Sequence, residues 1–194
     1  MYSGLLVYLM GPSGSGKDSV IDAAREQLAT LGVEVVQRVI TRSAESRGER
    51  ALGATPEAFA QMREAGAFAL CWRANELWYG IPNTIEACLA AGESVLINGS
   101  RGHLPEALAR YPDLLPIMLT VAPGVLEERL RGRGRETDEA IESRLMRNDA
   151  LLKEPGQWQV GGVDIVRIDN SGDLAVTVRA VVGVIDAALR RQRN

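Results

Sequence analysis

The sequence predicts an α/β fold in which a parallel sheet has helices on both faces. Two observations predict it. Apolar runs of strand length recur along the 194 residues, and the first, residues 4–10, is typical of a strand buried on both faces. A helical pattern and a second apolar run follow within about 35 residues, as in a strand–helix–strand unit whose strands are parallel.

The composition limits the class of protein. The chain is 46% hydrophobic, enough for one domain with a sizeable core. Its net charge of −3 gives no footprint for nucleic acid, and no run of about 18 apolar residues would span a membrane. The two cysteines, Cys71 and Cys88, lack metal-ligand spacing, and the N-terminus lacks the basic region of a signal peptide. We expect a cytoplasmic protein with reduced thiols.

The core elements follow in order. Val20, Ala24 and Leu28 recur at helical spacing over residues 17–31, and Gly32 ends that helix. Residues 33–40 are rich in β-branched side chains and predict the second strand. The later core elements are expected as a strand over residues 94–98, a helix over 104–110, a strand over 114–121, a helix over 123–130, a strand over 163–168 and a helix over 174–189.

Residues 41–92 differ from the rest. A polar stretch precedes a helix that Thr55 caps and Pro56 begins, followed by a short strand over 68–72 and a helix over 85–91. We interpret this segment as a small lobe, inserted between core strands, that holds a second substrate. The single domain, 1–194, then has a core of residues 1–40, 93–130 and 153–194, an acceptor-binding insert of 41–92 and a lid of 131–152.

A glycine-rich turn joins the first strand to the first helix. Gly11, Gly16 and Lys17 have the spacing G-x-x-x-x-G-K. Glycines let backbone N–H groups converge on phosphate oxygens, and Lys17 reaches the β- and γ-phosphates at the positive end of the helix. The residues expected to bind nucleotide phosphates are Gly11, Pro12, Ser13, Gly14, Ser15, Gly16, Lys17, Asp18 and Ser19.

Asp18 departs from this pattern, because Ser or Thr normally follows the lysine and binds Mg²⁺ through its hydroxyl. A carboxylate is also a good ligand for Mg²⁺, and its negative charge beside phosphates needs a cation. We expect Asp18 to position Mg²⁺, directly or through water. The alternative is a charge that only favours the helix dipole.

Arginines gather in residues 129–147, around Gly132 and Gly134. A solvated basic face would explain any one of them, but like charges this close are costly unless an anion joins them. We interpret the cluster as a mobile lid that closes on phosphates. The lid arginines expected to act on the transferring group are Arg131, Arg133, Arg135 and Arg144.

A phosphate-binding loop, an insert and a lid together indicate transfer of a phosphoryl group from ATP. That reaction needs mainly positioning, charge neutralisation by Mg²⁺ and cationic side chains, and exclusion of water. No Ser-His-Asp set is visible, and none is needed. His103, the one histidine, is expected to be a surface or capping residue and not a catalyst.

Residues 5–170 resemble the guanylate kinase family of nucleoside monophosphate kinases, which implies a P-loop kinase fold. Its P-loop is matched by residues 11–17, its acceptor-phosphate segment by 41–42 and 48–49, the motif whose Tyr contacts the acceptor phosphate by 66–68 and 78–82, and its lid by 129–134 with 144–145.

The departures from that family concern the base. The family reads guanine with a Ser before Thr-Thr-Arg and a Glu after Gly-x-Phe, where this chain has Arg38 and Cys71. Its Asp-Tyr-x-Phe segment is represented by residues 54–59, without the Tyr. A site built to hydrogen-bond a base loses that recognition when those groups are replaced. We expect an acceptor with phosphate but no guanine.

Gly-Lys-Asp-Ser at residues 16–19 and the segment 95–101 are similar to the ribose 1,5-bisphosphate phosphokinases of bacterial phosphonate utilisation. The resemblance implies ATP-dependent conversion of ribose 1,5-bisphosphate to 5-phosphoribosyl 1-diphosphate. A bisphosphate needs more cationic contacts than a monophosphate, a need that Arg38 and Arg101 would fit. The expected acceptor-binding residues are Arg38, Arg42, Arg47, Tyr79 and Arg101.

Other interpretations remain at this point. Asn170 is assigned to the adenine edge by analogy alone, and Tyr79 has an alternative role in packing the insert. The chain could be a guanylate kinase or a catalytically inactive guanylate kinase-like binding module, and a GTPase would need an Asn-Lys-x-Asp motif that is absent. We expect a small phosphorylated sugar as partner, with no nucleic acid and no membrane. The oligomeric state stays open, with a homodimer as one option.

Overall fold

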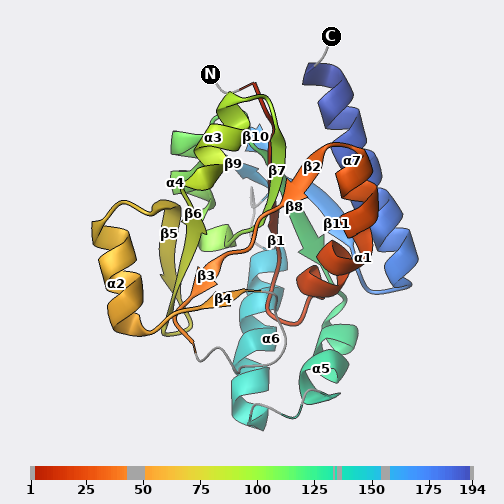
Figure 1. Ribbon diagram of the computed structural model, residues 1–194. Helices are drawn as coiled ribbons and strands as arrows, with labels where there is room; N and C mark the ends of the chain where they lie inside the picture. The colour runs from red at the N-terminus through yellow and green to blue at the C-terminus, as the bar shows by residue number, and fades with distance from the viewer. Residues whose placement is uncertain (1–2, 43–50, 133, 135–136, 154–157, 193–194) are drawn as a thin grey trace. The chain divides into compact units, whose positions relative to one another are not determined.

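Strands and helices alternate along most of the chain in the computed structural model (Figure 1). The structure describes residues 3–42, 51–132, 134, 137–153 and 158–192. Its elements are β1 (Leu6–Met10), α1 (Lys17–Thr30), β2 (Val33–Val35), β3 (Val39–Ile40), β4 (Leu52–Gly53), α2 (Pro56–Glu64), β5 (Phe68–Ala74), β6 (Leu77–Pro82), α3 (Thr84–Ala90), β7 (Ser94–Asn98), the 3₁₀ turn η1 (Arg101–His103), α4 (Leu104–Arg110), β8 (Leu115–Thr120), α5 (Pro123–Gly132), α6 (Asp138–Lys153), β9 (Gln159–Val160), β10 (Val163–Asp164), β11 (Val166–Asp169) and α7 (Leu174–Gln192).

A five-stranded sheet has the strand order β11-β8-β1-β7-β2. The pairs β11–β8 and β2–β7 are parallel, so the predicted α/β fold with a parallel sheet is confirmed. Every residue of β1 and of β7 is buried. Their continuous apolar runs follow from this burial, because a strand covered on both faces has no solvent side to alternate with.

The chain divides into two compact units. The first comprises Met1–Tyr8 and Arg25–Leu115, and the second comprises Leu9–Ala24 and Pro116–Asn194. The first unit also contains a second sheet, of order β4-β3-β6-β5. The helices α5 and α6 of the second unit lie side by side, joined by a core of Val121, Leu126, Leu130 and Ile141 (Figure 1).

The segment 33–40 is not the single strand that its β-branched composition predicts. Val36 N–H still donates to the Leu96 carbonyl of β7, at 3.0 Å. Two residues later the Arg38 carbonyl accepts instead from Leu52 N–H of β4, at 2.9 Å. The backbone changes hydrogen-bond partner between these positions, so β2 and β3 belong to different sheets.

The expected strand over 163–168 is also interrupted. β10 pairs antiparallel with β9, whereas β11 pairs parallel with β8. Ile165 N–H, between the two strands, donates to the Trp158 carbonyl at 2.8 Å. A change of pairing partner leaves no mark on hydropathy, so the sequence pattern alone merged the two strands.

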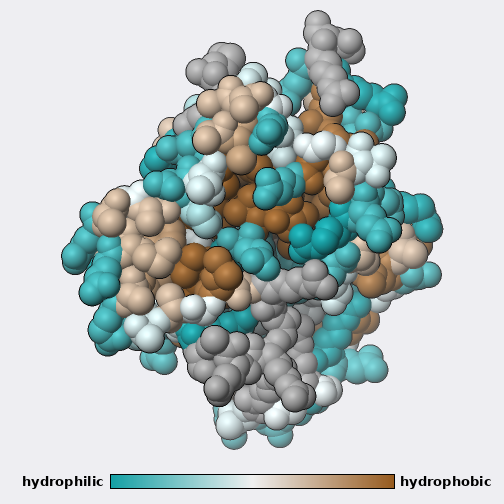
Figure 2. Space-filling model, viewed as in Figure 1, coloured by the Kyte–Doolittle hydropathy of each residue, from teal (hydrophilic) through white to brown (hydrophobic). Residues whose placement is uncertain are grey.

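Local capping produces the helix of the insert as predicted. The Thr55 hydroxyl accepts from Ala58 N–H at 3.1 Å, and Pro56 opens α2. The buried ring of Phe59 stacks on Phe68 of β5 with ring centroids 4.6 Å apart. Hydrophobic side chains also reach the surface over β3 and β4, where Leu52 is 52% exposed (Figure 2).

The strands β5 and β6 form a hairpin whose turn is Asn75-Glu76. Both residues have positive φ, 48° and 63°, as a two-residue primed turn requires. The hairpin register places Trp72 opposite Tyr79 and Cys71 opposite Gly80. None of the described helices is both long and apolar enough to cross a membrane.

Candidate active site

The phosphate-binding loop between β1 and α1 has the predicted glycine geometry. Gly14 and Gly16 have φ values of 90° and 84°, in the region that residues with a Cβ rarely enter. A Cβ on Gly11 would lie 2.9 Å from the Leu119 carbonyl oxygen of β8, and one on Gly14 would lie 2.9 Å from Leu126 Cδ1 of α5. The glycines are therefore required both by the backbone conformation of the loop and by its close packing against β8 and α5.

The side chain of Lys17 lies against the glycine-rich loop. Its Nζ donates to the Gly11 carbonyl at 2.9 Å and to the Pro12 carbonyl at 3.1 Å, so the ammonium folds back over the loop. Lys17 and Asp18 form the start of α1, where the helix N-terminus favours anions.

The donor set around Asp18 fits a magnesium ion held together with nucleotide phosphates. Within the described residues, no group of three or more His, Cys, Asp or Glu side chains could hold a metal alone. Mg²⁺ commonly takes one or two carboxylates and completes its shell with substrate phosphates and water. Asp18, one residue after Lys17, would supply such a carboxylate.

Asn170 holds the loop from the other side. Its buried Nδ2 donates to the Ser15 carbonyl at 2.7 Å, and its backbone N–H donates to the Thr120 carbonyl at 2.8 Å. A Cβ on Gly16 would come within 2.7 Å of this same Nδ2. Asn170 thus links the carboxyl ends of β8 and β11 to the phosphate loop, a contact that its assignment to the adenine edge did not include.

Arg129 also lies at this loop; in the sequence it falls within the lid motif, where it was given no role of its own. Its Nη1 is buried, makes no hydrogen bond within the part of the chain that is described, and lies 3.8 Å from where a Gly16 Cβ would be. Buried polar groups are normally paired, so this donor indicates a site for an anion or an acceptor atom of a ligand. The helical spacing of Leu126 and Leu130 could have indicated this position, because Arg129 precedes Leu130 on the buried side of α5.

The lid arginines have different positions. Arg131 Nε donates to Glu127 at 3.0 Å, and its Nη1 donates to Asp138, so it bridges α5 and α6. Its side chain is 44% exposed, and the hydrogen bond with Glu127 is the main reason that its pKa is raised. Arg144 is half-buried on α6. Arg133 and Arg135 lie outside the described residues.

In the first unit, the structure brings Arg38 and Tyr79 together. The Arg38 guanidinium lies 4.7 Å from the centroid of the Tyr79 ring, and its Nη1 donates to the Asn98 carbonyl of β7 at 3.0 Å. A guanidinium over an aromatic face is attracted by the ring and oriented by it. Arg38 is thus held at two points, between the second sheet and the end of β7.

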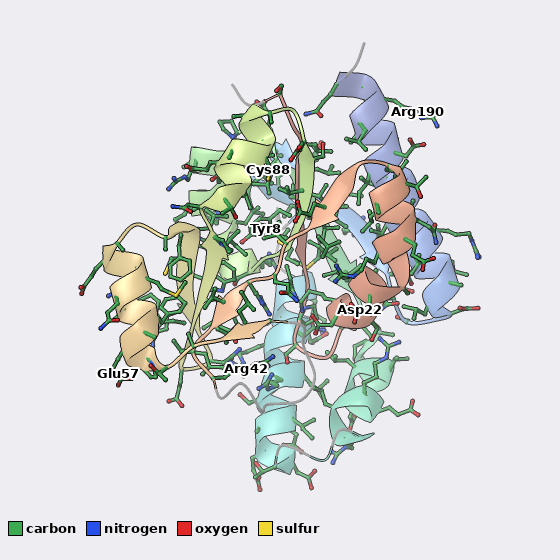
Figure 3. All side chains as sticks on the ribbon, in the orientation of Figure 1. Tyr8, Asp22, Arg42, Glu57, Cys88 and Arg190 are labelled. Atoms are coloured by element: carbon green, nitrogen blue, oxygen red, sulfur yellow. The ribbon has the colours of Figure 1, made fainter. Side chains whose placement is uncertain are left out.

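The strand pairing places Arg42 near the same residues. Ile40 pairs with Tyr79, and Thr41 fixes the chain after it: its Oγ1 accepts from Trp78 N–H at 2.8 Å. Arg42 then follows at the end of β3 (Figure 3). Arg101 is half-buried at the start of η1. Arg47 lies outside the described residues.

The expectation that His103 is a surface or capping side chain is not met, and the expectation that it is no catalyst stays a prediction. It stands at the N-cap position of α4, but its imidazole makes no capping hydrogen bond and is only 15% exposed. Its ring stacks on Trp72, with centroids 5.4 Å apart and planes at 25°. Burial lowers the pKa of His103, against the opposing charge of Glu106 at 3.7 Å, so the imidazole is neutral at pH 7. The sequence shows no period that would bring residues 72 and 103 together.

Cys71 is the residue that the resemblance to guanylate kinases matches to their base-reading Glu. Burial raises the pKa of its thiol, which is therefore neutral at pH 7. A neutral thiol is a weak hydrogen-bonding group and cannot replace a carboxylate that accepts from a guanine.

Two solved structures of kinases have this fold. Guanylate kinase from Anaplasma phagocytophilum aligns with a TM-score of 0.67 and 18% identity, over 95% of this chain and 85% of that one. A gluconokinase from Sinorhizobium meliloti aligns with a TM-score of 0.52 and 23% identity, over 100% of this chain and 99% of that one. At these identities the likeness concerns the fold, and it agrees with the predicted P-loop kinase architecture.

Curated relatives are much closer in sequence, although no family model matches the chain. The ribose 1,5-bisphosphate phosphokinase PhnN of Azotobacter vinelandii is 53% identical over 182 residues, which cover 94% of this chain and 96% of that protein. PhnN of Pseudomonas paraeruginosa is 54% identical, over 93% of this chain and 94% of that protein. At these identities and coverages, the chain belongs to the ribose 1,5-bisphosphate phosphokinase family.

Proposed function

We propose that the chain transfers the γ-phosphoryl group of ATP to ribose 1,5-bisphosphate, forming 5-phosphoribosyl 1-diphosphate and ADP. The observation that carries the proposal is the 53% identity, over 94% of the chain, to a relative named for that reaction. The product has its diphosphate at carbon 1, so the acceptor atom is an oxygen of the 1-phosphate. The 5-phosphate is retained and serves as a handle for binding.

The acceptor region supports a small bisphosphate over a nucleotide. Arg38 replaces the small Ser that precedes the acceptor arginine of guanylate kinases, and its contacts with Tyr79 and Asn98 fix the guanidinium. A planar guanidinium binds phosphate oxygens in pairs. We assign the acceptor phosphates to Arg38, Arg42, Tyr79 and Arg101, with Arg47 as a further candidate, within the insert of residues 41–92 and the segments that flank it.

The donor side uses the loop and the lid. Backbone N–H groups of residues 13–18 and the Lys17 ammonium would hold the β- and γ-phosphates, with Arg129 as an added contact. Mg²⁺ held by Asp18 would neutralise charge on the phosphates. The lid, residues 131–152, would bring Arg131, Arg133, Arg135 and Arg144 to the transferring group and exclude water. Asn170 would keep the loop in shape through its bond to Ser15.

An assay with two competing acceptors tests the proposal. Purified protein, ATP and Mg²⁺ would be offered ribose 1,5-bisphosphate and GMP together, with products followed by ³¹P NMR. We expect the diphosphate signals of the sugar product and no GDP. Formation of GDP alone would instead identify a divergent guanylate kinase.

The role of Asp18 predicts a change in magnesium dependence. In Asp18→Ala, the Mg²⁺ concentration for half-maximal rate should rise by about tenfold or more, because one carboxylate ligand is lost. Asp18→Thr, which restores the usual P-loop hydroxyl, should return it towards the wild-type value. Asp22→Ala, one turn along α1, is the matched control. An unchanged magnesium requirement in Asp18→Ala would leave only the helix-dipole role.

A further inference from the structure

The Tyr8 side chain holds the turn after β7 through two hydrogen bonds. The buried Tyr8 hydroxyl donates to the Ser100 carbonyl at 2.8 Å and accepts from Ser100 N–H at 3.0 Å. The same Ser100 carbonyl accepts from His103 N–H at 3.1 Å. A Cβ on Gly99 would lie 2.3 Å from the Tyr8 ring, so the turn and the ring are in close contact. His103 is therefore held at a fixed position relative to the end of β7.

A series of ring contacts leads from His103 back to β7. The imidazole stacks on Trp72, and Trp72 stacks on Tyr79 with centroids 5.6 Å apart and planes at 6°. Tyr79 has Arg38 over its ring, and Arg38 donates to the Asn98 carbonyl. Asn98 is two residues before Ser100, so the contacts form a closed circuit within the first unit.

In this series of contacts, the ring of Trp72 separates His103 from Tyr79 and Arg38. Trp72 is 6% exposed and His103 is 15% exposed, so neither ring offers a face to a sugar. The imidazole is neutral, and its Nδ1 lies 3.7 Å from Glu106 on α4. The contribution of the ring is therefore its flat surface: it supports Trp72, which supports Tyr79, which orients Arg38.

We propose that His103 is a positioning residue of the acceptor site, acting through the stacked rings of Trp72 and Tyr79 on the Arg38 guanidinium. The inference rests on the proposed function, because it takes Arg38 and Tyr79 as contacts of the acceptor phosphates. It adds a residue that touches neither substrate. Removing the imidazole of His103 would let the rings of Trp72 and Tyr79 move. The Arg38 guanidinium would then be oriented less often to bind the acceptor phosphate.

Steady-state kinetics on three variants test this. In His103→Ala, the KM for ribose 1,5-bisphosphate should rise by about two- to tenfold, the effect of one lost aromatic pair, with kcat and the KM for ATP unchanged. His103→Phe keeps a flat ring and should restore the acceptor KM. Glu106→Gln removes the charge beside the imidazole and keeps the ring, so it should match wild type. If His103→Ala does not fold, His103→Leu takes its place, since leucine fills the volume without a stacking face.

The single histidine also gives a direct signal. The imidazole Cε1–H resonance of His103 can be followed by ¹H NMR without assignment, because the chain has one histidine. We expect it to shift on addition of ribose 1,5-bisphosphate and to stay in place on addition of a non-hydrolysable ATP analogue.

The outcomes separate the two proposals. A wild-type protein that does not turn over ribose 1,5-bisphosphate would remove the proposed function. A wild-type protein that turns it over, with an unchanged acceptor KM in His103→Ala or an equal rise in His103→Phe, would overturn the role of His103 alone.

Discussion

Lys17 is the side chain whose loss should affect the reaction most. Lys17→Met removes the ammonium that we assign to the donor phosphates, and kcat/KM should fall by about 10²- to 10³-fold, as for other single groups that stabilise transition-state charge. The two hydrogen bonds of Nζ to Gly11 and Pro12 are at a half-buried site, so the unfolding temperature should change little.

Lys153→Met provides the matched control for that prediction. Lys153 is the other lysine of the chain and lies exposed on α6, where it pairs with Asp149 at 2.6 Å. An exposed ion pair four residues apart on a helix contributes little to the stability of the folded protein. Equal activity in the two variants would remove Lys17 from the catalytic machinery.

His103 gives the folded state a defined pH dependence. Its pKa is lowered by burial, so between the unfolded value of about 6.5 and the lower folded value the unfolded chain binds more protons. Stability should therefore fall as the pH drops through this window and level off below it. His103→Phe lacks this component. The check is the difference in unfolding free energy between the two proteins from about pH 8 to pH 5; a difference that does not change with pH would contradict the prediction.

The chemical roles of single residues could be predicted from their types, but their long-range contacts could not. Lys17, Asp18 and Arg38 could be selected because their types are rare or out of pattern in recognisable motifs. The bond from Asn170 to Ser15 and the burial of Arg129 Nη1 depend on how α5 and β11 lie against the loop. Such contacts join residues far apart in sequence, and no local spacing encodes them.

The helix α5 is packed directly on the phosphate loop. Besides its contact with Leu126, a Cβ on Gly14 would come within 3.0 Å of Leu130 Cδ2, and both leucines belong to the core shared with α6. Leu130→Ala should lower the free energy of unfolding by about 2–5 kcal/mol, the usual effect of truncating a buried leucine. Because the side chain also supports the loop, the KM for ATP should rise.

Val125→Ala tests whether that effect on ATP is specific. Val125 is partly buried against the same core but is not among the side chains nearest to Gly14. It should lose some stability, measured by chemical denaturation, and keep the KM for ATP. An ATP KM that stays at the wild-type value in Leu130→Ala as well would show that packing under Gly14 is not needed for binding.

Helices whose first residues carry a recognisable sequence signal were predicted well. Segments in which the backbone changes its strand partner were not. α1 and α2 have a loop glycine or a Thr-Pro cap to mark them. The turn at Asn75-Glu76 lacks glycine although both residues have positive φ, so the hairpin of β5 and β6 had no strong local signal. Segments 33–40 and 163–168 are continuous in hydropathy. Each is divided into two strands only because its two halves pair with different neighbouring strands.

Across the whole chain, the proposed donor and acceptor residues fall into different compact units. Lys17, Asp18, Arg129 and Asn170 belong to the second unit, whereas Arg38, Arg42, Tyr79 and Arg101 belong to the first. Each ligand should therefore stabilise its own unit. In hydrogen-exchange mass spectrometry, a non-hydrolysable ATP analogue should protect residues 11–18 and 126–131, and ribose 1,5-bisphosphate should protect 38–42 and 77–82. Equal protection of both sets by either ligand alone would contradict this division.

Tyr8 and Gly99 impose a constraint on how this family can diverge. An alanine at position 99 would put its methyl group 2.3 Å from the phenol ring, and a smaller residue at position 8 alone would leave a void and remove the hydroxyl that accepts from Ser100 N–H. We expect either change alone to destabilise the fold, and a matched pair of changes to be tolerated. Lineages that depart from tyrosine at the first position should carry a side chain at the second, so the two codons should vary together or not at all.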